Sequence, residues 1–218
     1  MTSPETTRAS GQVTERWCEF GPLRVGYDGS VLAPRPWTIV QSRHAAVLLE
    51  DAPAGPILEL HCGAGHIGQA AAAWSGRELV QVDDDPAACD WARRNAVANG
   101  VVADVWCARL EDLRTPDEMF ALVLADPPYV PSAETGRFVH DPRHAIDGGD
   151  DGLAGIRASL PVAARTVRRG GAILLQVRGA SQADTTREAV ADAELDLEVA
   201  DVLAVAPDRA VVVLTRPH

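Results

Sequence analysis

The sequence has few cysteines, and their spacing argues against two kinds of stabilising site. Its four cysteines, Cys18, Cys62, Cys89 and Cys107, are spread over a chain of 218 residues and form no C-x-x-C pair. Zinc sites and disulfide frameworks both depend on closely spaced or paired cysteines, so the sequence indicates neither. A chain of this length buries roughly 70% of its unfolded surface and forms a core without such sites.

Long apolar runs are absent too. No stretch approaches the ~18 apolar residues that span a bilayer. The first dozen residues are polar and contain no apolar segment of a signal peptide. We therefore expect a cytoplasmic protein with no membrane partner.

Cationic residues are scarce relative to acidic ones. The chain has 20 Lys and Arg against 31 Asp and Glu, which gives a formal net charge of −11. Binding to a nucleic-acid backbone depends on clustered cations, so this balance disfavours non-specific binding of DNA or RNA.

What the sequence does contain is an alternation of short apolar runs with segments of helical length. The runs indicate buried strands, and they lie at 56–60, 79–82, 101–106, 120–125, 172–177, 195–200 and 210–214. Such alternation predicts an α/β domain with a mostly parallel sheet covered by helices on both faces. We expect residues 1–16 to form a flexible tail and residues 17–218 a single domain that opens with a small hairpin at about 20–33.

Turn and stop signals set the expected boundaries. Asp28-Gly29 favours a tight turn inside the hairpin. Asp85 followed by Pro86 is typical of a helix start. A helix from Leu153 is expected to kink or restart at Pro161 and to end at Gly170.

A glycine loop follows the first strand expected in the sheet. Gly63, Gly65 and Gly68 fit the pattern G-x-G-x-x-G, and Asp83 ends the next strand. On spacing alone this pattern is compatible with a dinucleotide site. Glu59, just before the loop, argues otherwise, because its carboxylate would repel a pyrophosphate but suits a cationic ligand such as S-adenosylmethionine. Asp83 can accept hydrogen bonds from ribose hydroxyls in either case.

A second motif, Asp126-Pro127-Pro128-Tyr129, follows the strand at 120–125. Prolines donate no hydrogen bond and hold an extended backbone, so the Pro127 carbonyl is expected to be free. This carbonyl and the Asp126 carboxylate can each take one N–H of a planar NH2 group, while the Tyr129 ring stacks on its face. An amide nitrogen is a poor nucleophile because its lone pair is delocalised. Holding both hydrogens helps to free that lone pair for attack on an electrophilic methyl.

The stretch 31–38, the loop 59–65 and the motif 126–129 together resemble a known family. They are similar to the class I S-adenosylmethionine-dependent methyltransferases with an (N/D)PPY motif, and within these to the protein-(glutamine-N5) methyltransferases that act on peptide-chain release factors. The resemblance covers roughly 20–216. It implies a three-layer, Rossmann-like fold with a seven-stranded sheet in which the last strand is inserted antiparallel.

The resemblance also implies a cofactor, a partner and site residues. The cofactor would be S-adenosylmethionine, no metal is implied, and the partner would be a protein substrate whose glutamine side chain is methylated, such as a release factor. The residues implied to hold the cofactor are Glu59, Gly63, Gly65, Asp83, Asp84, Leu110 and Asp126. The residues implied at the acceptor are Arg35, Asp126, Pro127, Pro128 and Tyr129, of which Asp126, Pro127 and Tyr129 would be catalytic.

One departure from the family pattern leaves the acceptor open. The family usually has Asn where this chain has Asp126, and Asp there resembles the enzymes that methylate base amines. An exocyclic base amine of RNA or DNA therefore remains an alternative acceptor. A second departure keeps a small molecule as a further alternative: the bacterial release-factor enzymes carry a helical substrate-binding domain ahead of the hairpin, and only about 20 residues precede it here. An inactive domain that uses the same pocket only for binding is a further alternative.

The polar stretch between Val130 and Asp151 is long for a loop in a compact domain. Such loops tend to be functional or solvated. The sequence leaves both interpretations open: a lid over the acceptor or a solvated loop.

Overall fold

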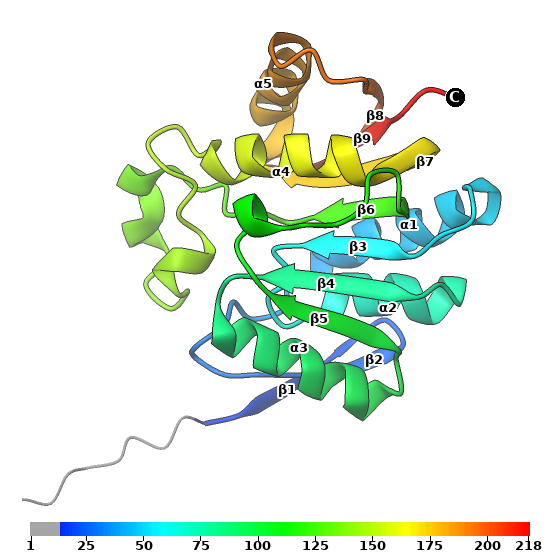
Figure 1. The fold of residues 1–218 in the computed structure, drawn as a ribbon. Helices are drawn as coiled ribbons and strands as arrows, with labels where there is room; N and C mark the ends of the chain where they lie inside the picture. The colour runs from blue at the N-terminus through cyan, green and yellow to red at the C-terminus, as the bar shows by residue number, and fades with distance from the viewer. Residues whose placement is uncertain (1–13) are drawn as a thin grey trace, which may run out of the picture.

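The computed structural model describes residues 14–218 (Figure 1). The tail expected at 1–16 lies mostly outside the described residues, and Arg16 already begins the first strand. None of the helices within the described range is long and apolar enough to span a bilayer.

Seven strands form one sheet, in the order β5-β4-β3-β6-β7-β9-β8. All neighbours pair in parallel except β9, which runs antiparallel to both β7 and β8. The expected fold class and the antiparallel insertion of the last strand are thereby confirmed. The strands are β3 (Ile57–Leu60), β4 (Leu79–Asp83), β5 (Ala103–Cys107), β6 (Phe120–Ala125), β7 (Val167–Val177), β8 (Glu198–Ala206) and β9 (Arg209–Thr215).

Helices cover both faces of this sheet, and Figure 1 shows α1 and α4 on opposite sides of it. Alternate residues of a strand point to opposite faces, and both faces here are apolar. Leu122 and Leu124 of β6 pack with α1, α2 and α3, whereas Val123 and Ala125 pack with α4 and α5. The helices are α1 (Ile39–Asp51), α2 (His66–Ser75), α3 (Pro86–Asn99), α4 (Ala154–Thr166) and α5 (Gly179–Asp192).

The parallel register brings three strand ends to one edge. Leu60 of β3 pairs with Val82 of β4 and with Ala125 of β6, so the three strands finish at nearly the same level. In Figure 1 their arrowheads lie on the same side, with the light green segment around residues 130–150 beyond them. Ligands of open parallel sheets bind at this edge.

The hairpin expected at about 20–33 is wrong in its boundaries. Its strands are β1 (Arg16–Phe20) and β2 (Leu23–Tyr27), and the turn between them contains Gly21 at φ +57°. Asp28 and Gly29 do form a turn, in which the Asp28 carboxylate accepts a hydrogen bond from the Ser30 backbone N–H. This turn does not connect two strands. Gly21 supplies the left-handed backbone that a tight turn needs. The turn of the hairpin therefore lies at Gly21 and not at Asp28-Gly29.

The expected end of the helix from Leu153 is also wrong. Helix α4 ends at Thr166, and the next residue, Val167, already pairs with Phe120 of β6. The stretch 168–171, expected as a helix stop, therefore belongs to strand β7. Pro161 lies inside α4, which does not restart there.

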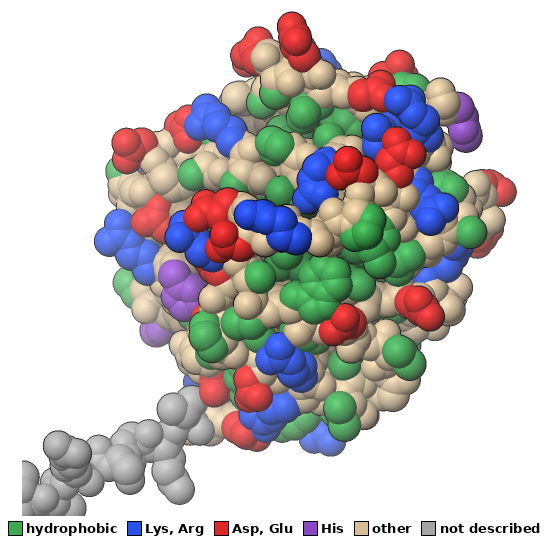
Figure 2. All heavy atoms as spheres, viewed as in Figure 1, with side chains coloured by type: hydrophobic (Ala, Val, Ile, Leu, Met, Phe, Trp, Pro, Cys, Tyr) green, Lys and Arg blue, Asp and Glu red, His purple; other side chains and the backbone are tan. Residues whose placement is uncertain are grey.

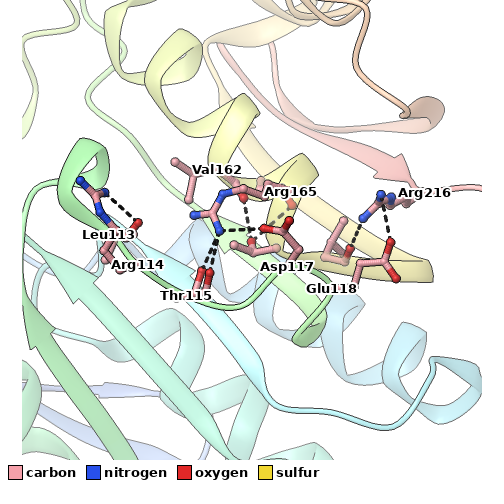
Figure 3. Close-up of polar contacts among 11 residues, drawn as sticks. Leu113, Arg114, Thr115, Asp117, Glu118, Val162, Arg165 and Arg216 are labelled. Carbon is pink, nitrogen blue, oxygen red and sulfur yellow. Dashed lines mark hydrogen bonds and ion pairs between the residues drawn. The ribbon is translucent and has the colours of Figure 1, made fainter.

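Salt bridges and hydrogen bonds hold the loop that leads into β6. Between β5 and β6 the structure has only the short 3-10 helix η2 (Leu110–Asp112) and an extended loop. Arg165 of α4 donates from Nη1 to the Thr115 carbonyl at 2.8 Å and to the Asp117 carboxylate at 3.0 Å (Figure 3). Glu118 pairs with Arg216 at 3.2 Å.

On the face seen in Figure 2, cationic side chains lie among acidic ones and form no patch of one sign.

Replacing Arg165 by Met should lower the melting temperature by about 2–4 °C. The substitution keeps the aliphatic stem of the side chain but removes the donors to Thr115 and Asp117. Because the Arg165 side chain is one-third exposed, we expect these contacts to contribute only about 1 kcal/mol to the free energy of unfolding. Thermal unfolding followed by circular dichroism measures the change. Arg187→Met, which removes an exposed pair within one helix, is the control and should leave the melting temperature unchanged. Equal effects of the two substitutions would contradict the role of Arg165.

Candidate active site

The glycine loop connects β3 to α2 through a left-handed backbone. His61, Gly63 and Gly65 all have positive φ, and the Gly65 N–H closes a turn on the Cys62 carbonyl at 2.7 Å. A side chain at Gly63 would extend into open space. One at Gly65 would collide with the amide groups of Gln69 and Gln81. Gly63 therefore exposes its backbone to a cavity, whereas Gly65 is needed for packing beneath the loop.

Glu59 lies under the loop instead of facing the cavity. The alternation of β3 turns Leu58 and Leu60 toward α4 and turns Glu59 toward α2. There the Glu59 carboxylate accepts hydrogen bonds from the Gly68 N–H at 3.0 Å and from the Gln81 side-chain amide. Burial raises the pKa of Glu59 to about 8, although these two hydrogen bonds oppose the shift. Glu59 thus supports the loop from below and does not line the glycine-loop cavity, so its contact with a cofactor stays a prediction.

Two buried glutamines complete the support of the loop. The Gln81 amide also donates to the Gly65 carbonyl at 3.0 Å. The Gln69 amide donates to the Gln81 side-chain oxygen at 2.9 Å and to the Ala92 carbonyl of α3 at 2.8 Å. Sequence patterning missed these residues, because a single glutamine on a strand or helix carries no periodic signal.

The end of β4 contributes a row of carboxylates. Asp83 accepts the Gly63 N–H at 2.9 Å on one oxygen and the Asp85 N–H at 3.0 Å on the other, and burial raises its pKa. Asp84 and Asp85 line the same cavity, and His144 lies 3.1 Å from the Asp85 carboxylate. Such a row repels a pyrophosphate but suits hydroxyl and cationic groups.

Two cavities open at this edge of the sheet. The glycine-loop cavity is lined by residues that include Gly63, Ala64, Asp83, Asp84, Asp85 and His144. The acceptor-motif cavity is lined by residues that include Trp37, Pro127, Tyr129, Phe138, Arg178 and Arg209. The two cavities share Leu32, Arg35, Thr38, Asp126, Pro128 and Ala145. They therefore meet at the first and third residues of the motif 126–129.

Two polar groups of the acceptor motif, the Asp126 carboxylate and the Pro127 carbonyl, line the acceptor-motif cavity. Within residues 14–218, no group donates a hydrogen bond to the Asp126 carboxylate or the Pro127 carbonyl. Burial raises the pKa of Asp126 to about 7, and the positive charge of Arg35 opposes that shift. Burial also raises the pKa of Tyr129, whose ring packs against the core beside the cavity. Two unpaired acceptors and an aromatic ring thus line one cavity, and their joint action on a planar NH2 group stays a prediction.

Segments that are distant in the sequence form the outer wall of this cavity. Arg35 forms an ion pair with Asp141, which lies in the stretch 130–151. The Arg209 guanidinium stacks on the Trp37 ring, 3.8 Å from its centroid. Arg178 pairs with Glu134 at 2.8 Å. Arg35 and Trp37 belong to the stretch 31–38 that carried the family resemblance, whereas no pattern in the sequence shows that Arg178 and Arg209 pack here.

Leu110 lies away from both cavities. It belongs to η2 and lines a separate surface hollow together with Leu113 and Val162. The structure therefore does not bring Leu110 together with the other residues that the resemblance implied at the cofactor. The reason is that the chain after β5 turns toward α4 and leaves the edge where the two cavities open.

No cluster of three or more His, Cys, Asp or Glu side chains with metal-binding geometry occurs in the part of the chain from residue 14 onward. The four cysteines are all free thiols.

Comparisons with known proteins agree with this geometry. A family model described as "Methyltransferase domain" matches residues 57–145. The chain is 38% identical over 161 residues to a release factor glutamine methyltransferase from Mycolicibacterium smegmatis, covering 70% of this chain and 56% of that protein. It is 33% identical over 185 residues to the release factor glutamine methyltransferase from Mycobacterium tuberculosis, covering 79% of this chain and 58% of that protein. The chain thus spans less than two thirds of the length of these relatives.

A solved structure shares the fold. A methyltransferase from Pyrococcus furiosus matches with a TM-score of 0.64 at 15% identity, over 90% of both chains.

The buried Glu59 carboxyl should make stability fall with rising pH. Its pKa is higher in the folded state than the ordinary 4.5, so the folded state binds more protons. This contribution is fully present below pH 4.5 and is lost as pH rises to about 8. In that window the free energy of unfolding of wild type should fall more steeply than that of Glu59→Gln, by up to about 1.4 kcal/mol per pH unit.

Urea unfolding at pH 5, 6, 7 and 8 measures both slopes. The control is Glu111→Gln, which removes an exposed carboxyl and should reproduce the wild-type slope. Parallel curves for wild type and Glu59→Gln would show that the carboxyl is ionised in the folded protein throughout this window.

Proposed function

We propose that this chain methylates the side chain of a protein glutamine. The premise is that the chain is a methyltransferase domain of the class I fold, similar in sequence to release factor glutamine methyltransferases. The methyl donor would be S-adenosylmethionine, and the acceptor atom would be the side-chain amide nitrogen. Activity, substrate and partner are all part of this proposal, because the chain spans only 56–58% of the relatives' length.

The junction of the two cavities carries the proposal. Asp126 and Pro128 line both the glycine-loop cavity and the acceptor-motif cavity. A ligand in the first cavity and a ligand in the second would therefore meet at this motif. Transfer of a small group between two bound molecules needs such a junction.

The residues of the glycine-loop cavity fit S-adenosylmethionine better than a dinucleotide. Asp83, Asp84 and Asp85 offer carboxylates to hydroxyl and cationic groups, and Gly63 leaves room for a ligand to approach the backbone. When bound, this cofactor supplies an electrophilic methyl on a positively charged sulfur. Asp83 would hold the ribose hydroxyls, because each of its oxygens accepts only one backbone hydrogen bond and retains a free lone pair.

At the acceptor, Asp126 and the Pro127 carbonyl would each accept one N–H of the amide. The Tyr129 ring would lie against the amide plane. As the nitrogen forms its bond to the methyl carbon, the methyl–sulfur bond would break, the sulfur would leave as a neutral thioether and the nitrogen would lose one proton to water. An ionised Asp126 would stabilise the positive charge that develops on the nitrogen. A pKa of about 7 leaves Asp126 ionised above neutral pH, so methyl transfer should be favoured there.

A base amine is the second candidate acceptor, and Asp126 favours it. A carboxylate stabilises a developing ammonium-like charge more strongly than an amide does. The net charge of −11 opposes this candidate, because nucleic acid would be repelled over much of the surface.

Methyl-labelled S-adenosylmethionine tests the function. The protein is incubated with a release factor, with total RNA, with DNA and with a small-molecule extract, and the location of the label is measured. We expect label in the release factor, on a glutamine located by mass spectrometry, and none with a Gln→Ala variant of that position. Label in RNA or DNA would establish the second candidate, and label in the extract would establish a small-molecule acceptor.

A binding control separates an inactive domain from an enzyme. S-adenosylmethionine should raise the melting temperature by mass action, and NAD should leave it unchanged. Stabilisation by NAD alone would contradict the cofactor. Stabilisation by S-adenosylmethionine without label in any fraction would favour a domain that only binds.

Replacing Asp126 by Ala should lower kcat by about 10²-fold or more and leave the affinity for S-adenosylmethionine nearly intact. The lost interaction acts mainly in the transition state, where the nitrogen becomes positive. Asp126→Asn keeps an acceptor oxygen and should retain much more activity if the acceptor is an amide. Steady-state kinetics and calorimetric titration measure the two quantities. Equal turnover by wild type and Asp126→Ala on the true substrate would exclude the acceptor role.

A further inference from the structure

Gln41 is a fully buried polar side chain in the first turn of α1. Its amide nitrogen donates hydrogen bonds to the Ala125 carbonyl at 3.1 Å and to the Leu174 carbonyl at 2.9 Å. Ala125 is the last residue of β6 and directly precedes Asp126. One NH2 group thus joins α1 to two neighbouring strands at the point where the acceptor motif begins.

The same turn of α1 also contacts the helix that follows the glycine loop. The Ser42 hydroxyl donates to the Ile67 carbonyl at 2.8 Å, and the Thr38 hydroxyl lies 3.5 Å from the His66 ring nitrogen. His66 and Ile67 are the first two residues of α2. Residues 38–42 therefore contact both the end of β6, where the acceptor motif begins, and the start of α2, which follows the glycine loop. The separation of these two segments decides how a methyl donor faces its acceptor.

We infer that Gln41 is a positioning residue that fixes the acceptor motif relative to the glycine loop. Only the NH2 group can face two carbonyls, because carbonyl oxygens accept hydrogen bonds and never donate them. In-line transfer needs the reacting atoms in a narrow geometry, and a misplacement of about 1 Å can cost about 10²-fold in rate. The inference rests on the proposed methyl transfer for its kinetic consequence but not for its structural one.

Space filling alone does not account for an amide at this position. The Gln41 side-chain oxygen has no hydrogen-bond partner within residues 14–218, and burying such a group is costly. A leucine would occupy a similar volume at this fully buried position without that cost. The two hydrogen bonds, to the end of β6 and to Leu174 of β7, are what the glutamine adds.

Two variants separate hydrogen bonding from packing. Gln41→Leu removes the donors, and Gln41→Glu keeps the shape but presents oxygens to the two carbonyls. The control is Leu49→Ala, which leaves a cavity at the other end of the same helix and should lower the melting temperature.

Kinetics give the first measurement. We expect Gln41→Leu to lower kcat about tenfold or more, with the dissociation constant for S-adenosylmethionine changed by less than about twofold. Leu49→Ala should keep the wild-type kcat when assayed below its melting temperature. A kcat that follows the melting temperature across all three variants would reduce Gln41 to a packing residue and overturn the inference.

Hydrogen exchange gives a measurement that needs no acceptor. With the hydrogen bonds gone, the backbone amides of Asp126, Tyr129 and Val130 should exchange about tenfold faster in Gln41→Leu, while those of 63–67 keep their wild-type rates. Unchanged exchange at the acceptor motif would overturn the inference even in an active enzyme. If wild type methylates nothing but the motif exchanges faster, the proposed function fails while Gln41 still holds the motif.

Discussion

Parallel pairing of β3 with β4 and with β6 is the constraint on which the whole site depends. Because the three strands end at one level, the glycine loop, the carboxylates after β4 and the acceptor motif emerge side by side. None of these segments has a ligand-binding geometry by itself. At this shared edge the glycine loop, the carboxylates after β4 and the unpaired acceptors of Asp126 and Pro127 lie close together. Their chemistry arises from that proximity.

That edge concentrates negative charge in a buried place. Burial raises the pKa of Glu59, Asp83 and Asp126, and the hydrogen bonding of Asp126 differs from that of the other two. Glu59 and Asp83 accept backbone N–H groups of the glycine-loop region, which stabilise their ionised forms. Asp126 has no such donor and relies on the charge of Arg35. Of these three carboxyls, the one without a hydrogen-bond donor among the described residues is therefore the one that lies where the two cavities meet.

The sequence predicted those parts of the molecule that carry a local signal. Strands appeared as apolar runs, and Gly63, Asp83 and the motif 126–129 followed from spacing. Glu59 was expected at the ligand, but strand alternation places it beneath α2, a detail that only the register of β3 determines. Leu110 was expected from the family pattern and lies elsewhere, because the chain after β5 turns toward α4. Trp37, Arg178 and Arg209 meet only through tertiary packing, and no periodicity announces such contacts.

Insertion of β9 as an antiparallel strand has a consequence for how the acceptor site can be altered. A strand that runs opposite to its neighbours begins where they end, so the β8–β9 turn delivers Asp208 and Arg209 to the wall of the acceptor-motif cavity. Neither residue lines the glycine-loop cavity. A directed-evolution library confined to this turn would therefore change the wall of the acceptor-motif cavity and leave the lining of the glycine-loop cavity unchanged.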